Sequence, residues 1–182
     1  MPGSTPGFLV AMPHLKDPNF ADTVVLMLEH NAEGAVGLVV NRPFPGDPGT
    51  IATGLGIDWP RRTLGQVRYG GPVRTQNGCL LHPPSNLFPD SQIVGSGIAV
   101  STSRDALTGV LESPSCPFRL MLGYAGWGPG QLERELREGS WLFVPVSSAL
   151  LFDTPADKIY DMALASIGAQ RFTLGSGGSN IH

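Results

Sequence analysis

Runs of apolar residues along the chain predict a sheet with many strands. The segment 7–11 indicates a first short strand, because apolar residues fill it and a proline follows at position 13. Two longer apolar runs, 23–30 and 35–41, flank the turn-forming residues 31–34 and predict a β-hairpin. Both runs are nearly continuous rather than alternating, so these strands are expected to be covered on both faces. Shorter runs indicate further strands at 66–69, 77–82, 97–101, 118–122 and 141–146.

Helical signals mark three segments, and a shorter helix is expected in a fourth. The signals are a residue that can cap a helix, an apolar stripe at helical spacing, and a glycine or proline at the end. In the last helix, Ile159, Met162, Ala163 and Ile167 are expected to face inward. Because strands outnumber helices and arrive in consecutive groups, the predicted fold class is α+β. The helices are expected from Thr102 or Ser103 to Glu112, from Pro129 to Glu138, at 155–167, and briefly at 51–55.

Composition narrows the class of protein further. The 182 residues are 41% hydrophobic and only 15% charged, and they include 24 Gly and 17 Pro, which implies many turns and argues against a helix bundle. No linker-like stretch divides the chain, so one domain over residues 1–182 is expected, with a flexible Gly/Ser tail at 175–182. The N-terminus lacks the basic region of a signal peptide, and no apolar run approaches the roughly 20 residues of a membrane span. These features predict a soluble cytoplasmic protein.

Net charge bears on possible nucleic-acid binding. The formal charge of −3 opposes general attraction to polyanions, because such binding depends on many Lys and Arg residues. One stretch differs, since it holds four arginines with no acid among them. They are expected to be solvated around a loop, with contact to DNA as the alternative. The four are Arg61, Arg62, Arg68 and Arg74.

The spacing of one cysteine and one histidine could indicate nucleophilic or metal chemistry, but it has a better structural explanation. Cys79 and His82 form C-x-x-H, but residues three apart on a strand project to opposite faces, so they are expected not to converge. Cys79 and Cys116 are expected to be free thiols, since two cysteines cannot build a disulfide framework. No histidine pair has the spacing of a zinc site, so neither a metal nor a cofactor is predicted.

Polar groups at strand ends suggest a site at the rim of the sheet. Asn41 and Arg42 end the second hairpin strand, while His30 ends the first. In a hairpin register His30 pairs near Ala35 and Asn41 near Val24, which separates the two motifs by about 20 Å at about 3.3 Å per residue. A His30–Arg42 catalytic pair is therefore disfavoured. A binding pocket that includes Asn41 and Arg42, together with the turn at 70–72, stays open. So does the simpler interpretation that Asn41 closes a turn and Arg42 pairs with an acid.

A glycine-rich stretch, 123–130, leaves a strand and opens a helix, as phosphate-binding loops do. It lacks both the G-K-[S/T] ending of a Walker A loop and the G-x-G-x-x-G spacing of dinucleotide sites. Tyr124 and Trp127 within it can stack on a ring or fill the core. Glu133 and Glu135 follow on the next helix, where they are expected to be solvated.

Four blocks of the sequence resemble the AlgH/YqgE family of bacterial proteins. They recur in the family's order over roughly residues 6–170. The resemblance implies a mixed, partly rolled-up β-sheet like an incomplete barrel, with helices packed outside it. It supplies no agreed catalytic residues or cofactor, although some members carry the label of transcriptional regulator. The blocks are GFLVAMP with DPNF (7–20), EHN through GAVGLVVNRP (29–43), YGGPV followed by LH (69–82), and GYAGW with GQLE (123–133).

The sequence thus predicts a non-catalytic binding or regulatory protein whose protein or small-molecule partner is unidentified. One alternative is a small hydrolase or transferase with a pocket near Asn41, Arg42 and His82. Another is a transcriptional regulator that contacts DNA through the stretch from Arg61 to Arg74. The candidate binding residues are Asn41, Arg42, Gly70, Gly71, His82, Tyr124 and Trp127.

Overall fold

The computed structural model describes residues 7–60 and 63–166. The flexible tail predicted at 175–182 lies outside these ranges, as do Arg61, Arg62 and Ile167. Every helix within the described ranges is too short or too polar to cross a lipid bilayer.

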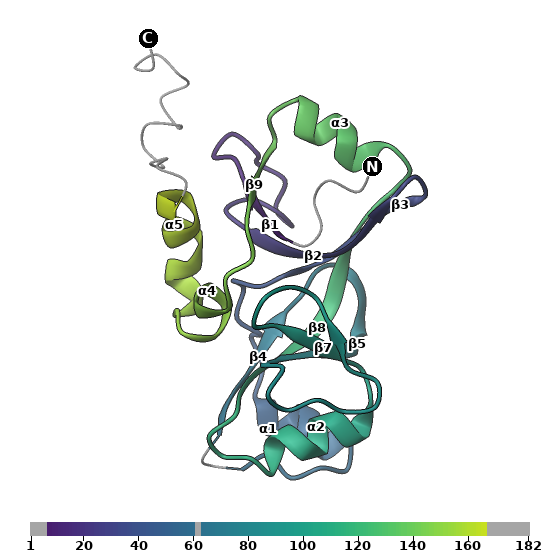
Figure 1. Cartoon of the computed structure of the whole chain (residues 1–182), viewed down its shortest axis with the longest axis vertical. Helices are drawn as coiled ribbons and strands as arrows, with labels where there is room; N and C mark the ends of the chain where they lie inside the picture. The colour runs from purple at the N-terminus through teal and green to yellow at the C-terminus, as the bar shows by residue number, and fades with distance from the viewer. Residues whose placement is uncertain (1–6, 61–62, 167–182) are drawn as a thin grey trace.

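The described strands form one curled sheet. They are β1 (Gly7–Ala11), β2 (Val24–Asn31), β3 (Gly34–Val39), β4 (Leu64–Tyr69), β5 (Val73–His82), β6 (Gln92–Ile93), β7 (Ala99–Ser101), β8 (Pro117–Trp127) and β9 (Trp141–Val144). The hydrogen-bonded order is β6-β7-β5-β8-β3-β2-β1-β9, and β4 pairs with β8 beside this path. Among the pairings of the described strands, only that of β4 with β8 is parallel. The predicted α+β fold with a mixed, partly rolled-up sheet is confirmed (Figure 1).

Helices flank the sheet at both ends and along one side. They are α1 (Pro48–Gly54), α2 (Arg104–Leu111), α3 (Gln131–Arg137), α4 (Ser148–Phe152) and α5 (Ala156–Ser166). As Figure 1 shows, α1 and α2 lie at one end, α3 at the other, and α4 and α5 along the side. Ser103, one of the two caps that the sequence predicted, caps α2 by accepting the N–H of Ala106 at 3.1 Å.

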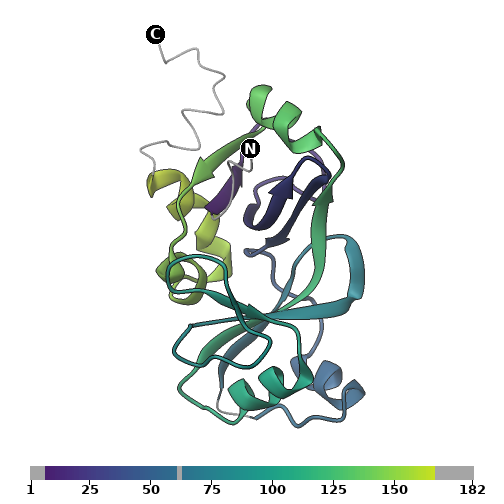
Figure 2. The ribbon, with the colours of Figure 1, turned by 45° about the vertical axis from the view of Figure 1, so that its right-hand side comes forward.

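Strand β8 joins the two halves of the sheet. Its first part runs parallel to β4, from Leu64 opposite Pro117 to Tyr69 opposite Leu122, and antiparallel to β5. Its last residues, 125–127, pair with β3 instead. Figures 1 and 2 show β1, β2, β3 and β9 in the upper half, β4, β5 and β7 in the lower half, and β8 passing between them. One strand therefore sets the relative position of both halves.

Two glycines pack backbone against backbone where the halves meet. Gly71 has φ +148° and Gly123 has φ +79°, a region that residues with side chains rarely adopt. A Cβ on Gly71 would lie 2.2 Å from the carbonyl carbon of Tyr124, and one on Gly123 would lie 2.3 Å from the carbonyl oxygen of Gly71. The register of β5 against β8 also shifts here, between Val73 and Gly78. Only residues without a side chain allow this close approach.

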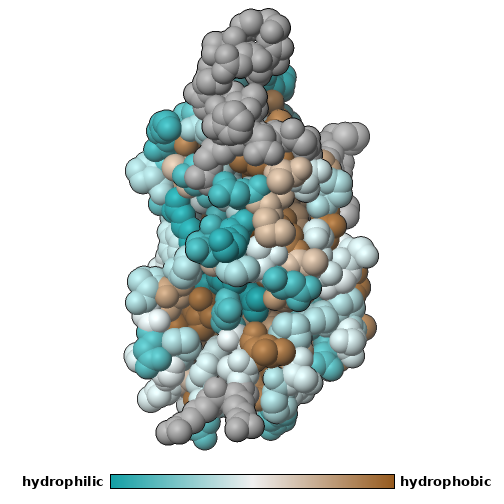
Figure 3. Space-filling model, turned by 90° about the vertical axis from the view of Figure 1, so that its left-hand side faces the viewer, coloured by the Kyte–Doolittle hydropathy of each residue, from teal (hydrophilic) through white to brown (hydrophobic). Residues whose placement is uncertain are grey.

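The hydrophobic core has a larger and a smaller cluster of buried side chains. The larger packs strands β1 to β3 against α5, with Leu9, Leu26 and Ile159 fully buried. The smaller packs α2 against the lower half of the sheet, where Leu107 and Phe118 meet. The surface is poor in charge, and Figure 3 shows one face on which small hydrophobic patches interrupt hydrophilic and near-neutral side chains.

Several elements differ from the sequence predictions. Met162, expected to face inward, is 51% exposed, and Tyr160 and Leu164 are buried beside Ile159 and Ala163 instead. The glycine-rich stretch expected to be a loop continues strand β8 as far as Trp127, because β3 provides a partner for its backbone. The two-residue strand β6 and the five-residue helix α4 are too short to leave a periodic signal.

The expectation of four solvated arginines is wrong for Arg68. This side chain is 1% exposed and donates to the carbonyl of Val40 and to Gln66 Oε1, both at 2.6 Å. Burial, and then the nearby charge of Arg119, lowers the pKa of Arg68 to about 10, so it is still protonated at neutral pH. Arg74 is exposed and has φ +49°. Arg68 is thus a structural residue that links β4 to the end of β3.

Replacing Gly71 by alanine should strongly destabilise the fold. The new Cβ would overlap the backbone of Tyr124 and strain the positive φ, so we expect the free energy of unfolding to fall by about 3 kcal/mol or more. Urea denaturation measures this change. Gly126→Ala is the control, since its Cβ would meet only a Tyr124 ring carbon at 3.8 Å. Equal stability of the two variants would contradict the role assigned to Gly71.

Candidate functional site

A carboxylate on α3 joins two tryptophans from different strands. Glu135 Oε1 accepts the indole N–H of Trp127 at 3.0 Å and that of Trp141 at 2.9 Å, while Oε2 accepts from Gln131 at 2.9 Å. Both tryptophans are buried, so their N–H groups need an acceptor. The ring of Phe20 lies 5.9 Å from Trp127 and 5.8 Å from Trp141, between ring centroids. These contacts hold α3 against β8 and β9.

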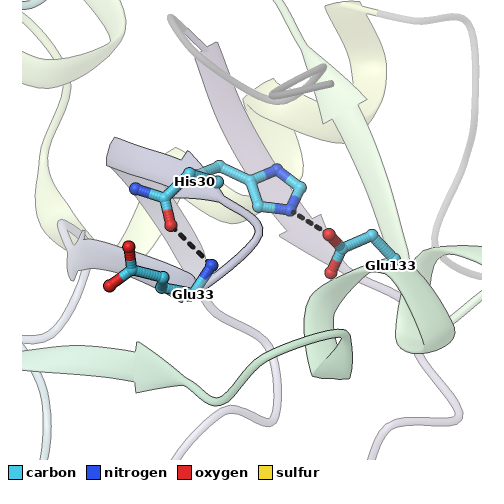
Figure 4. Close-up of polar contacts among 4 residues, drawn as sticks. His30, Glu33 and Glu133 are labelled. Carbon is cyan, nitrogen blue, oxygen red and sulfur yellow. Dashed lines mark hydrogen bonds and ion pairs between the residues drawn. The ribbon is translucent and has the colours of Figure 1, made fainter.

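A histidine on β2 contacts the same helix. His30 is buried, and its Nε2 lies 3.2 Å from Glu133 Oε2 (Figure 4). The pKa of Glu133 is below its ordinary value, because its own backbone N–H and then the His30 ring stabilise the charged form. At the hairpin turn beside it, the N–H of Glu33 donates to Asn31 Oδ1 at 2.8 Å. Two blocks that carry the family resemblance, far apart in the sequence, meet at this contact.

Asn41 and Arg42 hold the turn that precedes β2. Asn41 Oδ1 accepts the N–H of Val24 at 2.9 Å, and its Nδ2 donates to the carbonyl of Asp22 at 2.9 Å. Arg42 Nη2 donates to the carbonyl of Ala21 at 3.0 Å. His30 pairs with Ala35 at the far end of the hairpin. The predicted separation of His30 from Asn41 and Arg42 is confirmed.

A mainly apolar pocket of about 470 Å³ lies between α1, α2 and the lower half of the sheet, and we name it the α1–α2 pocket. Its apolar wall comprises Ile51, Leu55, Ile57, Leu80, Leu107, Leu120 and Leu122, together with Gly54, Gly78 and Cys79. Its polar residues are Gln76, Ser101, Thr102, Ser103 and Arg104. The volume falls within the range of about 300–1,000 Å³ that is usual for pockets that bind small molecules.

Behind this pocket, Ser101 is hydrogen-bonded to a fully buried histidine. His82 Nδ1 lies 3.0 Å from the carbonyl of Pro83, and Nε2 lies 2.8 Å from Ser101 Oγ. Because a carbonyl can only accept, Nδ1 carries the proton and the Ser101 hydroxyl donates to Nε2. Ser91 Oγ lies 2.7 Å from Ser101 Oγ and accepts the N–H of Phe88. Burial lowers the pKa of His82, which favours the neutral ring that these hydrogen bonds require.

The backbone donors next to Ser101 are occupied by Asp90. Its Oδ2 accepts the N–H of Thr102 at 2.7 Å and that of Ser103 at 3.0 Å, and its Oδ1 accepts the Ser103 hydroxyl at 2.7 Å. These bonds, that of the Ser103 hydroxyl above all, hold the pKa of Asp90 below its ordinary value. The N–H groups that could stabilise an oxyanion beside Ser101 are therefore already used. A carbonyl, not a carboxylate, orients His82, unlike a serine-hydrolase triad.

None of the seven candidate residues from the sequence lines the α1–α2 pocket, although the structure brings the backbones of Gly71 and Tyr124 into contact and bonds the carbonyl of Arg42 to Tyr69, next to Gly70. Asn41 and Arg42 hold the turn before β2, Gly70 and Gly71 are buried against the backbone of Gly123 and Tyr124, Trp127 contacts Glu135, and His82 contacts Ser101. Their role in binding a ligand stays a prediction. Sequence reasoning missed the pocket wall, which consists of ordinary apolar residues from four elements.

The expectation that Glu133 and Glu135 are merely solvated is wrong. Glu133 meets His30, and Glu135 accepts from Trp127 and Trp141. The sequence does place a tryptophan before and after the short helix that carries these two acids. That pattern could not show which side chain accepts from which indole.

Both cysteines are poor nucleophiles. Cys79 lines the α1–α2 pocket, and burial raises the pKa of its thiol to about 12. Burial also raises the pKa of Cys116. Since the thiolate is the reactive form, neither is activated at neutral pH. Both ring nitrogens of His82 are engaged by Pro83 and Ser101 and not by Cys79.

Glu135→Ala should destabilise the protein, because it leaves the buried indole N–H groups of Trp127 and Trp141 without their acceptor. We expect the free energy of unfolding to fall by about 2–4 kcal/mol, with a changed tryptophan emission spectrum. Chemical denaturation followed by fluorescence measures both. Glu138→Ala, an exposed change next to the same helix, should alter stability by less than about 0.5 kcal/mol. Equal effects would refute the assignment.

Comparisons with known proteins agree on one family. A family model described as AlgH-like matches residues 8–171. The chain is 40% identical over 188 residues to a UPF0301 protein of Anaeromyxobacter sp. strain K, covering 97% of this chain and 95% of the relative. It is 42% identical over 171 residues to a UPF0301 protein of Idiomarina loihiensis, covering 92% of each.

Solved structures show the same fold. The solution structure of the AlgH protein from Pseudomonas aeruginosa has a TM-score of 0.75 and 39% identity, covering 93% of this chain and 91% of that one. A crystal structure of a protein from Corynebacterium diphtheriae has a TM-score of 0.73 at 20% identity, over 89% and 86% of the two chains, which shows the fold alone. The match along nearly the whole chain establishes that this protein belongs to the AlgH-like family.

Proposed function

We propose that this protein is a non-catalytic binding protein whose ligand occupies the α1–α2 pocket. The observation that carries the proposal is the pocket itself. It has about 470 Å³ of space, an apolar wall built from α1, α2, β5 and β8, and polar groups on one part of the lining. Such apolar concavities with a few convergent polar groups are the usual form of small-molecule sites.

The residues of the lining support one kind of ligand. Leu80, Leu107 and Leu120 offer an apolar surface, so the body of the ligand should be apolar. Arg104 is the only charged residue among the described residues of the lining, and Gln76 adds an amide. A polar or anionic head group would complement these two side chains. The proposed ligand is therefore a small amphiphile with an anionic or hydrogen-bonding head.

A regulatory role would act through α1. Ala52 is the one residue of this helix that is buried, and Ile51 and Gly54 line the pocket. A ligand beneath the helix would add the apolar contacts that α1 otherwise lacks, so its position would depend on occupancy. This supports a protein that signals through binding rather than turnover.

Filling the pocket tests the proposal. Gly54 lines the pocket, and a Cβ added there meets no atom within 4 Å, so Gly54→Leu should project into free space without strain. We expect wild type to bind one equivalent of the apolar anionic dye anilinonaphthalene sulfonate, and Gly54→Leu to bind it at least about tenfold more weakly. A fluorescence titration measures both affinities.

Gly126→Leu is the matched control, because it makes the same change at an exposed site of β8 outside the pocket. It should leave dye affinity unchanged. If Gly54→Leu binds the dye as wild type does, the pocket is not the site and the proposal fails.

A small hydrolase or transferase is the second candidate, favoured by one observation. Ser101 lines the pocket and its hydroxyl donates to the neutral imidazole of His82 at 2.8 Å, as a nucleophile would to its base. The donors occupied by Asp90 argue against it. Direct DNA binding is not proposed, because Arg68 is buried and the net charge is −3.

The two candidates differ in the reactivity of Ser101. On the binding proposal, a fluorophosphonate probe should leave Ser101 unlabelled, and short p-nitrophenyl esters should not be hydrolysed above background. Intact-protein mass spectrometry detects the adduct. Labelling that is lost in both Ser101→Ala and His82→Ala, in protein that is still folded, would establish the hydrolase instead.

A further inference from the structure

Two buried arginines lie on one face of the lower half-sheet. In the parallel β4–β8 pair Gln66 is opposite Arg119 and Arg68 is opposite Met121, so Arg68 and Arg119 are diagonal neighbours. They are 1% and 3% exposed. Among the described residues, each donates only to backbone carbonyls or to Gln66, and no carboxylate lies within ion-pair distance of either. Buried charges are ordinarily paired, which makes these two arginines candidates to hold an anion.

The guanidinium of Arg119 has donors to spare. Nη1 donates to the carbonyls of Leu64 at 3.2 Å and Phe118 at 2.9 Å, and Nη2 donates to that of Phe152 at 2.9 Å. These three bonds use three of the five N–H groups. The buried Nε has no acceptor among the described residues. Burial lowers the pKa of Arg119 to about 10, so the group still carries its charge at neutral pH.

Arg119 lines a second pocket of about 490 Å³, which we name the Arg119 pocket. Thr63, Gln66 and Ser115 contribute polar side chains to it, and Phe152 and Asp153 close one side. Successive residues of a strand project to opposite faces of the sheet. Arg119 lines this pocket and Leu120 lines the α1–α2 pocket, so the two pockets lie on opposite faces of β8. The ring of Phe152 lies 5.7 Å below the guanidinium, which fixes the orientation of that group.

We propose that the Arg119 pocket is a second ligand site, which takes the phosphate or carboxylate group of a small organic anion. Oxygens of the anion accept from the Nη2 N–H of Arg119 that the backbone carbonyls leave over and from the hydroxyl of Ser115, and the charge of the guanidinium adds attraction. Guanidinium groups form charge-assisted hydrogen bonds with both kinds of oxyanion. The pocket is larger than a phosphate ion, which leaves room for an organic body against Phe152. This site does not depend on the function proposed for the α1–α2 pocket.

One residue opposes the anion. Asp153 lines the pocket and its charge favours the protonated form of Arg119, yet it makes no ion pair with it. Its carboxylate would repel a bound anion through space. This yields a test in which a substitution strengthens binding, an effect that damage to the fold cannot imitate.

The experiment titrates the full chain with sodium phosphate and, separately, with sodium acetate, at an ionic strength held constant with chloride. Isothermal calorimetry measures the dissociation constants. We expect saturable binding, a dissociation constant about fivefold lower in Asp153→Asn, and one about threefold or more higher in Ser115→Ala. The stronger of the two probes identifies phosphate or carboxylate as the preferred group.

Asp157→Asn is the matched control, since it removes one negative charge from an exposed position on α5 outside the pocket lining. It should leave both dissociation constants unchanged. Gly54→Leu should also have no effect, which separates this site from the α1–α2 pocket. Absence of saturable binding of either probe, or equal gains in Asp153→Asn and Asp157→Asn, would overturn the proposal.

Discussion

The backbone contact between Gly71 and Gly123 is the constraint on which the rest of the structure depends. It lies where β8 leaves the lower half-sheet and enters the upper one, so it sets the angle between the two halves. No side chain mediates this contact, and no side chain could enter it without moving the backbone. The curl of the sheet, and with it the concave spaces on both faces of β8, follows from that close approach.

Most of the buried polar side chains form hydrogen bonds that hold the fold together, whereas the free donors lie at the two pockets. Glu135 accepts from two indoles, His82 is enclosed by Pro83 and Ser101, and Arg68 donates to Val40 and Gln66. Each of these fixes the position of a strand or helix and leaves little capacity for chemistry. N–H groups that are free to donate to a ligand occur instead at the two pockets, on the guanidinium of Arg119 and on the exposed side chain of Arg104. That distribution supports binding more than catalysis.

Local patterns predicted the elements whose signals lie within a few residues of one another. The β2–β3 hairpin, the cap of α2 at Ser103 and the inward face of α5 at Ile159 and Ala163 are examples. Hairpin register also separated His30 from Arg42 correctly, because counting along two antiparallel strands needs no further information. Both pockets went unpredicted, since their walls are leucines, glycines and single polar residues that are unremarkable in sequence.

The sequence by itself determined the family, the α+β class and most strands and capped helices, because these follow from periodicity, capping and motif order. Tertiary structure alone decided which polar residues meet. It placed Arg68 in the interior, brought Glu135 to two tryptophans, and continued β8 through a glycine-rich segment that reads locally as a loop. The physical reason is that each outcome depends on a partner strand or helix supplied from elsewhere in the chain. Propensity describes a segment alone, whereas burial and hydrogen bonding depend on what packs against it.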